Sequence, residues 1–132
     1  PYPYGLDDAE VFLNSLQAPD TDQVFVIDHP RDGAIGVVGF APAEDRPGHE
    51  LGYWLGRDYW GQGYATEATT AALDWARSTW GRRFVVAGHF ADNPASGAVL
   101  DKAGFLYTGE VISRRAKARG QEAPVRMMVW LA

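Results

Sequence analysis

The stretch RDYWGQGYATEA (57–68) joins a glycine-containing turn to the start of a helix, a combination that can bind an anion. Gly61 and Gly63 permit positive φ angles and place no Cβ between the backbone and a ligand. The first turn of a helix has N–H groups without intrahelical acceptors, and the positive end of the helix dipole lies there. The turn predicts a phosphate site, although a plain strand-to-helix turn would use the same glycines.

Two common phosphate motifs do not fit this turn. A Walker loop would continue with Gly-Lys-Ser or Gly-Lys-Thr, which does not follow Gly63. A dinucleotide fingerprint would need a third glycine and would follow the first strand of its fold, whereas several expected strands precede this turn. The surrounding elements therefore have to decide what the turn binds.

Helix and strand patterns alternate along the chain. Apolar residues at helical spacing predict three helices, over 6–17, 64–79 and 94–103. Short β-branched and aromatic runs predict six strands, over 23–28, 34–41, 49–55, 83–90, 105–112 and 125–132. The first two strands read as a hairpin, Gly81 is placed to end the second helix, and Asn93 and Gly104 bound the third. This order predicts a single α/β or α+β domain over residues 1–132.

Composition describes an ordinary globular protein. The chain has 132 residues, 46% of them hydrophobic and 22% charged, and no apolar run approaches the length of a membrane span. The absence of cysteine excludes disulfides, thiol catalysis and cysteine-ligated zinc, and we expect no metal. The first residues lack the features of a signal peptide. A cytoplasmic location is the default expectation, although absent cysteine fits either redox compartment.

Charge is distributed unevenly. Residues 1–50 carry 10 acidic and 2 basic side chains, whereas residues 111–132 carry 1 acidic and 5 basic side chains. An acidic first third argues against nucleic-acid binding, which needs a basic face. It would suit a cationic partner such as an amine, or it is a solvated surface of no further meaning.

The motifs together resemble the GNAT acetyltransferase superfamily, and within it the ribosomal-protein alanine N-acetyltransferases. The cofactor motif of that family, Gln/Arg-x-x-Gly-x-Gly/Ala, is matched at residues 60–65 by WGQGYA, with Trp60 in the first position as in this branch. The segments ELGYWL (50–55) and ADNPASGAVLDKAGF (91–105) flank it in the expected order. The resemblance covers roughly residues 6–131.

The resemblance implies a mixed, mostly antiparallel central sheet flanked by helices, and acetyl-CoA as co-substrate. It implies that backbone amides from Gln62 to Thr66 bind the pyrophosphate, that the strand at Trp54 and Leu55 pairs with the pantetheine arm, and that Lys102 lies near the nucleotide. Asn93 would contact the pantetheine region while also capping a helix. The expected cofactor-binding residues are Trp54, Leu55, Gly61, Gln62, Gly63, Tyr64, Ala65, Thr66, Asn93 and Lys102.

The family normally begins with a strand and a helix that this sequence lacks. About 35 to 45 residues would be missing at ordinary element lengths. We therefore expect a fragment, a processed form or an incomplete record. A sheet without that segment would have an uncovered edge strand, which favours association, for example as a homodimer, or poor stability.

Acetyl transfer needs a group that takes a proton from the amine and a group that protonates the leaving thiolate. The tyrosine that many GNAT enzymes use as the acid aligns with Leu100, so Ser96 is the expected acid, although it is also a helix-start hydroxyl. For the base, Glu50 and His49 are neighbours that point to opposite faces of one strand. We choose Glu50 as the base because it shares a face with Gly52 and Trp54. It would take the proton of the amine directly or through water.

The sequence therefore predicts an N-acetyltransferase that acts on a primary amine, most simply a protein N-terminus. Small amines such as polyamines or aminoglycosides are the alternative acceptors, and neither a nucleic acid nor a membrane is an expected partner. A non-catalytic acyl-CoA or nucleotide sensor would keep the phosphate turn without the base. An interaction module would instead use Trp54, Tyr59 and Trp60 as a contact patch.

Overall fold

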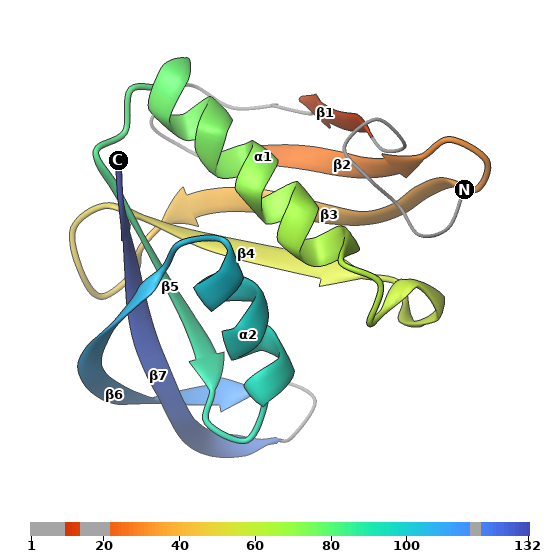
Figure 1. Cartoon of the computed structure of the whole chain (residues 1–132). Coiled ribbons are helices and arrows are strands. Elements are labelled where there is room, and N and C mark those ends of the chain that lie inside the picture. Colours follow the sequence, from red (N-terminus) through yellow and green to blue (C-terminus); the bar gives the residue numbers. More distant parts are fainter. Residues whose placement is uncertain (1–9, 14–21, 117–119) are drawn as a thin grey trace.

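The computed structural model describes residues 10–13, 22–116 and 120–132 of the chain. Seven strands in this part form one sheet: β1 (Glu10–Leu13), β2 (Gln23–His29), β3 (Gly33–Pro42), β4 (His49–Leu55), β5 (Phe84–Phe90), β6 (Leu106–Ala116) and β7 (Gln121–Leu131). The spatial order is β1-β2-β3-β4-β5-β7-β6, and Figure 1 shows how the elements follow one another. Two α-helices accompany the sheet, α1 (Tyr64–Ser78) and α2 (Pro94–Lys102).

The sheet consists of two antiparallel parts that meet at one parallel contact. Strands β1 to β4 pair antiparallel, and so do β5, β7 and β6. Between the two parts, β4 and β5 run parallel and pair in register only at Glu50 and Val86. Beyond that point the two strands diverge, as Figure 1 shows.

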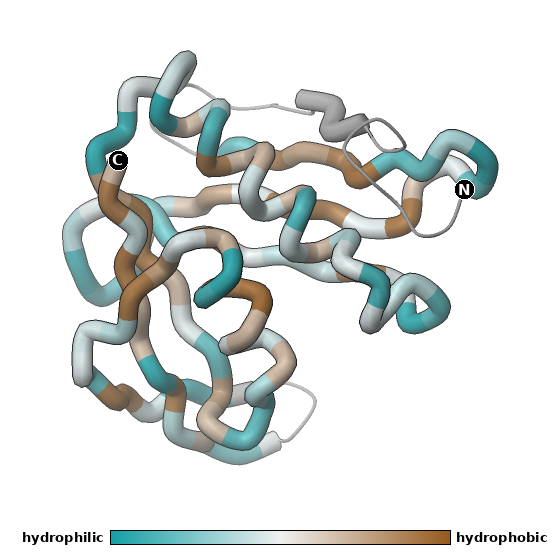
Figure 2. The backbone as a smooth tube through the Cα atoms, viewed as in Figure 1, coloured by the Kyte–Doolittle hydropathy of each residue, from teal (hydrophilic) through white to brown (hydrophobic). Residues whose placement is uncertain are grey.

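Helix α1 covers one face of the first part and forms the centre of the core. Its inward residues are small, with Ala68, Ala72 and Ala76 almost completely buried, so the helix packs close to the sheet. The aromatic ring of Trp75 meets Phe25 edge-on at 4.8 Å between ring centroids. Figure 2 shows apolar stretches of β2 and β3 next to this helix, which places the core between α1 and the sheet.

Helix α2 packs against β5 of the second part at an unusually close distance. A Cβ on Gly97 would lie 2.7 Å from Nε2 of His89 and 2.9 Å from the hydroxyl oxygen of Tyr107. His89 is buried, and its Nε2 makes a 2.9 Å hydrogen bond with that hydroxyl. Only glycine allows this approach, so Gly97 fixes the position of the start of α2 against the sheet.

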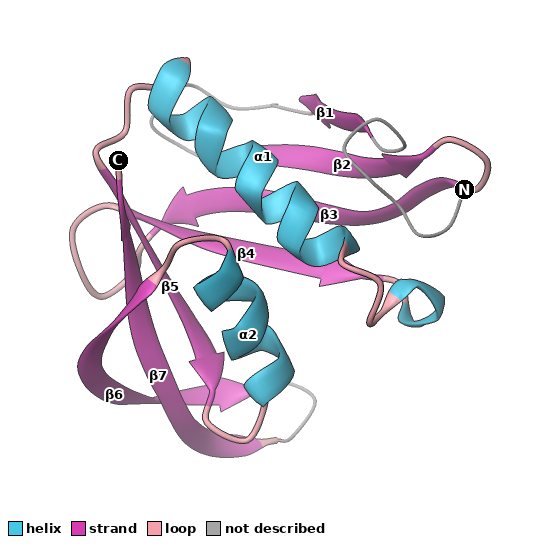
Figure 3. Cartoon of the chain, viewed as in Figure 1, coloured by secondary structure: helices cyan, strands magenta, loops and turns pink. Residues whose placement is uncertain are grey.

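The structure confirms the predicted mixed, mostly antiparallel sheet and all six expected strands. The last two strands extend further into the basic connection than predicted, to Ala116 and from Gln121. Helix α1 ends at Ser78, one residue earlier than expected, and Gly81 follows it with a φ of 73°. Figure 3 shows α1, α2 and, between β4 and α1, the short 3-10 helix η1 (Arg57–Tyr59).

The prediction of a helix over 6–17 is wrong for the residues of this range that the structure describes. Residues Glu10–Leu13 form β1, which pairs antiparallel with β2. The helical spacing of apolar residues was overridden by pairing with the exposed edge of β2, since tertiary contacts outweigh local propensity in short segments. Residues 6–9 and 14–17 lie outside the described residues. No helix in the described part of the chain is long and apolar enough to cross a membrane.

Candidate functional site

A cleft of about 710 Å³ lies where β4 and β5 separate. One wall is the edge of β4 from Glu50 to Leu55, which has no register partner on β5 after Glu50. The glycine turn and first residues of α1 form one end, and α2 contributes residues from its first to its last turn. Strand β4 and the turn that follows it thus surround one space together with α2, which is distant from them in the sequence.

The glycine turn has the conformation that the sequence predicted. Gly61 and Gly63 have φ angles of 76° and 85°, and Gly63 is the N-cap of α1 without a side-chain cap. The first helical hydrogen bond runs from the N–H of Glu67 to the carbonyl of Gly63, so the amides of Ala65 and Thr66 precede it. A Cβ at either glycine would meet no protein atom within 4 Å. The turn therefore borders open space, as an anion site requires.

The side chains of Trp60 and Gln62 make hydrogen bonds to the segment that precedes this turn. The indole N–H of Trp60 donates to the carbonyl of Leu55 at 2.8 Å, and the Arg57 guanidinium lies 5.6 Å from the indole ring centroid. The Gln62 amide donates to the carbonyl of Asp58 at 3.2 Å. These bonds hold the loop against the end of β4, and one lone pair of the Leu55 carbonyl is already used by Trp60.

Helix α2 brings the other expected residues to the same cleft. Asn93 is the N-cap of α2, because its Oδ1 accepts a 3.3 Å hydrogen bond from the Ser96 N–H. This confirms the capping role expected from the sequence. Lys102, in the last turn, also lines the cleft and adds a positive charge. The structure therefore brings together all the expected cofactor residues except Gln62, which braces the turn beside them.

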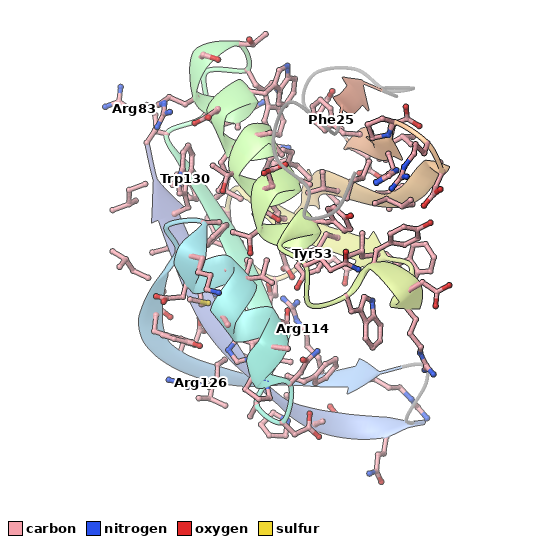
Figure 4. The ribbon with its side chains drawn as sticks, turned by 45° about the vertical axis from the view of Figure 1, so that its right-hand side comes forward. Phe25, Tyr53, Arg83, Arg114, Arg126 and Trp130 are labelled. Atoms are coloured by element: carbon pink, nitrogen blue, oxygen red, sulfur yellow. The ribbon has the colours of Figure 1, made fainter. Side chains whose placement is uncertain are left out.

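Tyr53 is a cleft residue that sequence reasoning missed. Its hydroxyl donates a 3.3 Å hydrogen bond to Oγ of Ser96, linking β4 to the start of α2 (Figure 4 labels Tyr53). Burial raises the pKa of the Tyr53 phenol, and the bond to Ser96 opposes that rise. Alternation along β4 could have indicated it, since Tyr53 has the opposite parity to Glu50 and Trp54 and so points to the helix side of the sheet.

A second cavity of about 880 Å³ lies along β4, and its lining shares Glu50 to Trp54 with the first. It reaches β3, the loop that follows it, and the end of β6. Its charged lining residues are the carboxylates of Asp22, Glu44, Asp45 and Glu50 and the guanidinium groups of Arg114 and Arg115. The acidic majority suits a cationic ligand on this side of β4.

The Glu50 carboxylate is paired with an arginine in this cavity. Arg114 of β6, labelled in Figure 4, donates two hydrogen bonds to its carboxylate, at 2.5 and 2.9 Å. The bond to Glu50 raises the pKa of the Arg114 guanidinium, so Arg114 stays charged. A bidentate pair of this kind is geometrically specific. Any proton acceptor role for Glu50 must therefore begin from a carboxylate that is already paired.

A second ion pair ties the same two parts of the sheet together. Arg46, in the loop after β3, donates to Glu110 of β6 and to its neighbour Asp45. Asp45 in turn lies 3.9 Å from Arg114, so the charged groups form one network. The uneven charge distribution along the sequence did not indicate this network, in which Arg46 comes from the acidic first third.

Two further residues from the sequence analysis, His49 and Leu100, are both buried. His49 lies on the opposite face from Glu50, where it is buried with its ring 4.6 Å from that of Trp80. Leu100, at the position of the tyrosine of the family, is a core residue that is 2% exposed. No group of three or more His, Cys, Asp or Glu residues in the described part of the chain is arranged to hold a metal ion.

Comparison with known proteins identifies the architecture. The family model for the acetyltransferase (GNAT) domain matches residues 1–106. The chain belongs to the GNAT acetyltransferase domain family. This agrees with the resemblance found in the sequence.

Two curated proteins of similar sequence are both named as acetyltransferases. The chain is 31% identical over 97 residues to an uncharacterized N-acetyltransferase, p20, of Bacillus licheniformis, covering 73% of this chain and 54% of that protein. It is 38% identical over 80 residues to a ribosomal-protein-serine acetyltransferase of Escherichia coli (strain K12), covering 59% of this chain and 44% of that protein. The chain thus spans about half the length of these relatives.

Solved structures share the fold at lower identity. The ribosomal-protein-S5-alanine acetyltransferase of Vibrio fischeri has a TM-score of 0.74 at 21% identity, covering 83% of this chain and 61% of that chain. The spermidine N-acetyltransferase of Vibrio cholerae in complex with CoA and spermine has a TM-score of 0.73 at 18% identity, covering 85% of this chain and 66% of that chain. These likenesses establish the GNAT fold.

The open space beside the glycine turn generates a first prediction. Gly63→Val should weaken acetyl-CoA binding about tenfold or more, because its side chain would enter the space next to the first-turn amides. Isothermal titration of acetyl-CoA into the parent and the variant measures the loss.

Gly81→Val is the matched control for backbone strain. Gly81 also has a positive φ, 73°, and a Cβ there would also meet no atom within 4 Å, but it lies after the end of α1, far along the helix from the turn. Both variants should lose stability through left-handed strain. Only Gly63→Val should lose affinity, and equal affinity of Gly63→Val and the parent would show that the turn does not bind phosphate.

Proposed function

We propose that this protein transfers the acetyl group of acetyl-CoA to a primary amine, and that the acceptor is a protein N-terminus. The observation that carries the proposal is the separation of β4 from β5 beside the glycine turn. It gives one cleft for a phosphate-bearing arm on the helix side and a second, acidic cavity for an amine along the same strand. Membership of the GNAT family supplies the chemistry that fits this pair of cavities.

On the cofactor side, the proposed roles follow the position of each group. The amides of the first turn of α1 would bind the pyrophosphate, with Lys102 as an additional cation. The edge of β4 at Trp54 and Leu55 would pair with the pantetheine arm through backbone groups, as an added strand does. Asn93, the N-cap of α2, would hold the start of that helix beside the pantetheine arm. The solved relative from Vibrio cholerae contains CoA, which agrees with this choice of co-substrate.

On the acceptor side, Glu50 is the proposed proton acceptor. The amine must be neutral to attack the carbonyl carbon, and the carboxylate at the border of the two cavities is placed to take its proton, directly or through water. Because Arg114 holds both oxygens of Glu50, an incoming ammonium group would compete with the guanidinium for them. The remaining carboxylates of the cavity would keep the local potential favourable for a cation.

The choice of a protein N-terminus over a small amine is supported by the sequence relatives. A ribosomal-protein-serine acetyltransferase is among the curated relatives, at 38% identity over 80 residues. The acidic cavity favours a polyamine equally, so polyamines are the second candidate. We also propose a cytoplasmic location, which is the default expectation of the sequence analysis.

An acceptor panel tests the proposal. Release of free CoA from acetyl-CoA should be measured with N-terminal peptides beginning with Ala or Ser, with spermidine and with an aminoglycoside. We expect the highest kcat/KM with the peptides. Highest activity with spermidine would favour the second candidate, and transfer only to O-nucleophiles would contradict an amine acceptor.

Cofactor binding without transfer would instead support an acyl-CoA sensor. Trp54 and Trp60 line the cleft and are 64% and 60% exposed, so their fluorescence should respond to acetyl-CoA. No response at about 1 mM acetyl-CoA, with a folded protein, would contradict both the enzyme and the sensor and leave the aromatic side chains as a contact patch.

The role of Glu50 has its own prediction. Glu50→Gln should lower kcat about tenfold to a hundredfold and change the shape of the pH–rate profile, because an amide cannot accept the proton. The affinity for acetyl-CoA should be unchanged, since the side chain turns toward Arg114 of β6 and away from the glycine turn.

Asp74→Asn is the matched control for loss of an arginine-paired carboxylate. Asp74 accepts a 2.7 Å hydrogen bond from Arg77 on the exposed face of α1, outside both cavities. Its kcat and pH–rate profile should equal those of the parent. An unaltered profile in Glu50→Gln would remove Glu50 from the role of base.

A further inference from the structure

The structure assigns to Tyr53 a part in protonating the leaving group, a role that rests on the proposed acetyl transfer. We propose that Tyr53 is a positioning residue that acts through Ser96, as the inner member of a two-hydroxyl relay that delivers a proton to the thiolate. Three observations support it: the direction of the hydrogen bond, the place of the pair in the cleft, and the fixed position of α2.

The direction of the hydrogen bond leaves the right proton available. The Tyr53 hydroxyl donates to Oγ of Ser96, so the hydrogen of the Ser96 hydroxyl can point to a third group. The Ser96 N–H is separately used by Asn93. Burial raises the pKa of Tyr53, which keeps the phenol protonated near neutral pH and able to serve as a donor.

The pair lies where the two cavities meet. Tyr53 lines both cavities, and Ser96 lines the cofactor cleft only. The tyrosine position of the family is taken by Leu100, which is in the core and offers no proton. Tyr53 therefore brings a phenol to the cleft from β4, the opposite wall to the helix that carries Leu100.

The neighbouring residue on α2 keeps this pair in place. Gly97 follows Ser96 and approaches the His89–Tyr107 pair so closely that a Cβ would lie 2.7 Å from Nε2 of His89. The first turn of α2 is thus fixed against β5 and by the Asn93 cap, so the backbone of Ser96 is held beside Tyr53.

The proposed step balances in atoms and charge. The amine nitrogen bonds to the acetyl carbonyl carbon, the nitrogen loses a proton to Glu50, directly or through water, and the carbon–sulfur bond breaks with its electron pair on sulfur. The thiolate takes the hydroxyl proton of Ser96, and Ser96 takes the phenol proton of Tyr53 in the same movement. Glu50 then releases its proton to water and Tyr53 recovers one from water, so no net proton is gained or lost.

The test compares Tyr53→Phe, Ser96→Ala and the double variant with the parent, in the acceptor assay. We expect each single variant to lower kcat about tenfold while leaving the KM and the Kd for acetyl-CoA unchanged. Because the two groups form one relay, the double variant should be no slower than the slower single variant. A merely structural role would change stability or the affinity for acetyl-CoA and leave kcat of the folded, saturated enzyme unchanged.

Ser78→Ala is the matched control for Ser96→Ala, because it removes a helix hydroxyl that is also hydrogen-bonded, to the carbonyl of Asp74, but lies at the end of α1 and belongs to neither cavity. It should leave kcat and the Kd for acetyl-CoA unchanged. A parent protein without any acetyl transfer would overturn the proposed function and the relay with it. An active parent whose Tyr53→Phe variant keeps full kcat, or whose two variants are additive, would overturn the relay alone.

Discussion

Strands β4 and β5 pair at one position and then separate, and the functional geometry of this chain depends on that separation. A sheet normally satisfies the backbone of each inner strand on both sides. Here the edge of β4 after Glu50 faces a cleft, although β4 lies in the middle of the strand order. An extended ligand can therefore use an inner strand as its partner, which a continuous sheet would not permit.

The two parts of the sheet must be held at a fixed distance if the opening is to keep its shape. On the helix side, the bond from Tyr53 to Ser96 connects β4 to α2, and the Gly97 contact sets the height of α2 above β5. On the other side, Arg114 connects β6 to Glu50, and Arg46 connects the loop after β3 to Glu110. Groups that have proposed chemical roles thus also span the gap, so changes at either side are expected to affect both geometry and reactivity.

Much of the fold followed from local patterns. The strand over 49–55, the positive φ angles of Gly61 and Gly63, and the Asn93 cap were all predicted from residue types that have strong local preferences. The prediction failed at Glu10–Leu13, where pairing with β2 determined the structure in place of the helical spacing. Short edge segments take their structure from neighbours, and a single sequence does not contain that information directly.

The site was predictable to a smaller extent, for a similar reason. Residues that are proposed to bind through the backbone of a local turn, such as Ala65 and Thr66, could be located from the motif alone. Tyr53 and Arg114 could not, because their importance comes from partners 43 and 64 positions away in the sequence. Strand alternation indicated the right faces of β4, but only the three-dimensional arrangement selects the pairs.

The central claim is that the first turn of α1 binds phosphate at the end of the β4–β5 opening. Amide hydrogen exchange of Ala65 and Thr66, measured by NMR with and without saturating acetyl-CoA, tests it most directly. These amides precede the first helical hydrogen bond, so they should exchange rapidly in the free protein and slow about tenfold or more when phosphate oxygens accept them. Unchanged exchange at both residues while acetyl-CoA is bound would place the phosphates elsewhere and contradict the account.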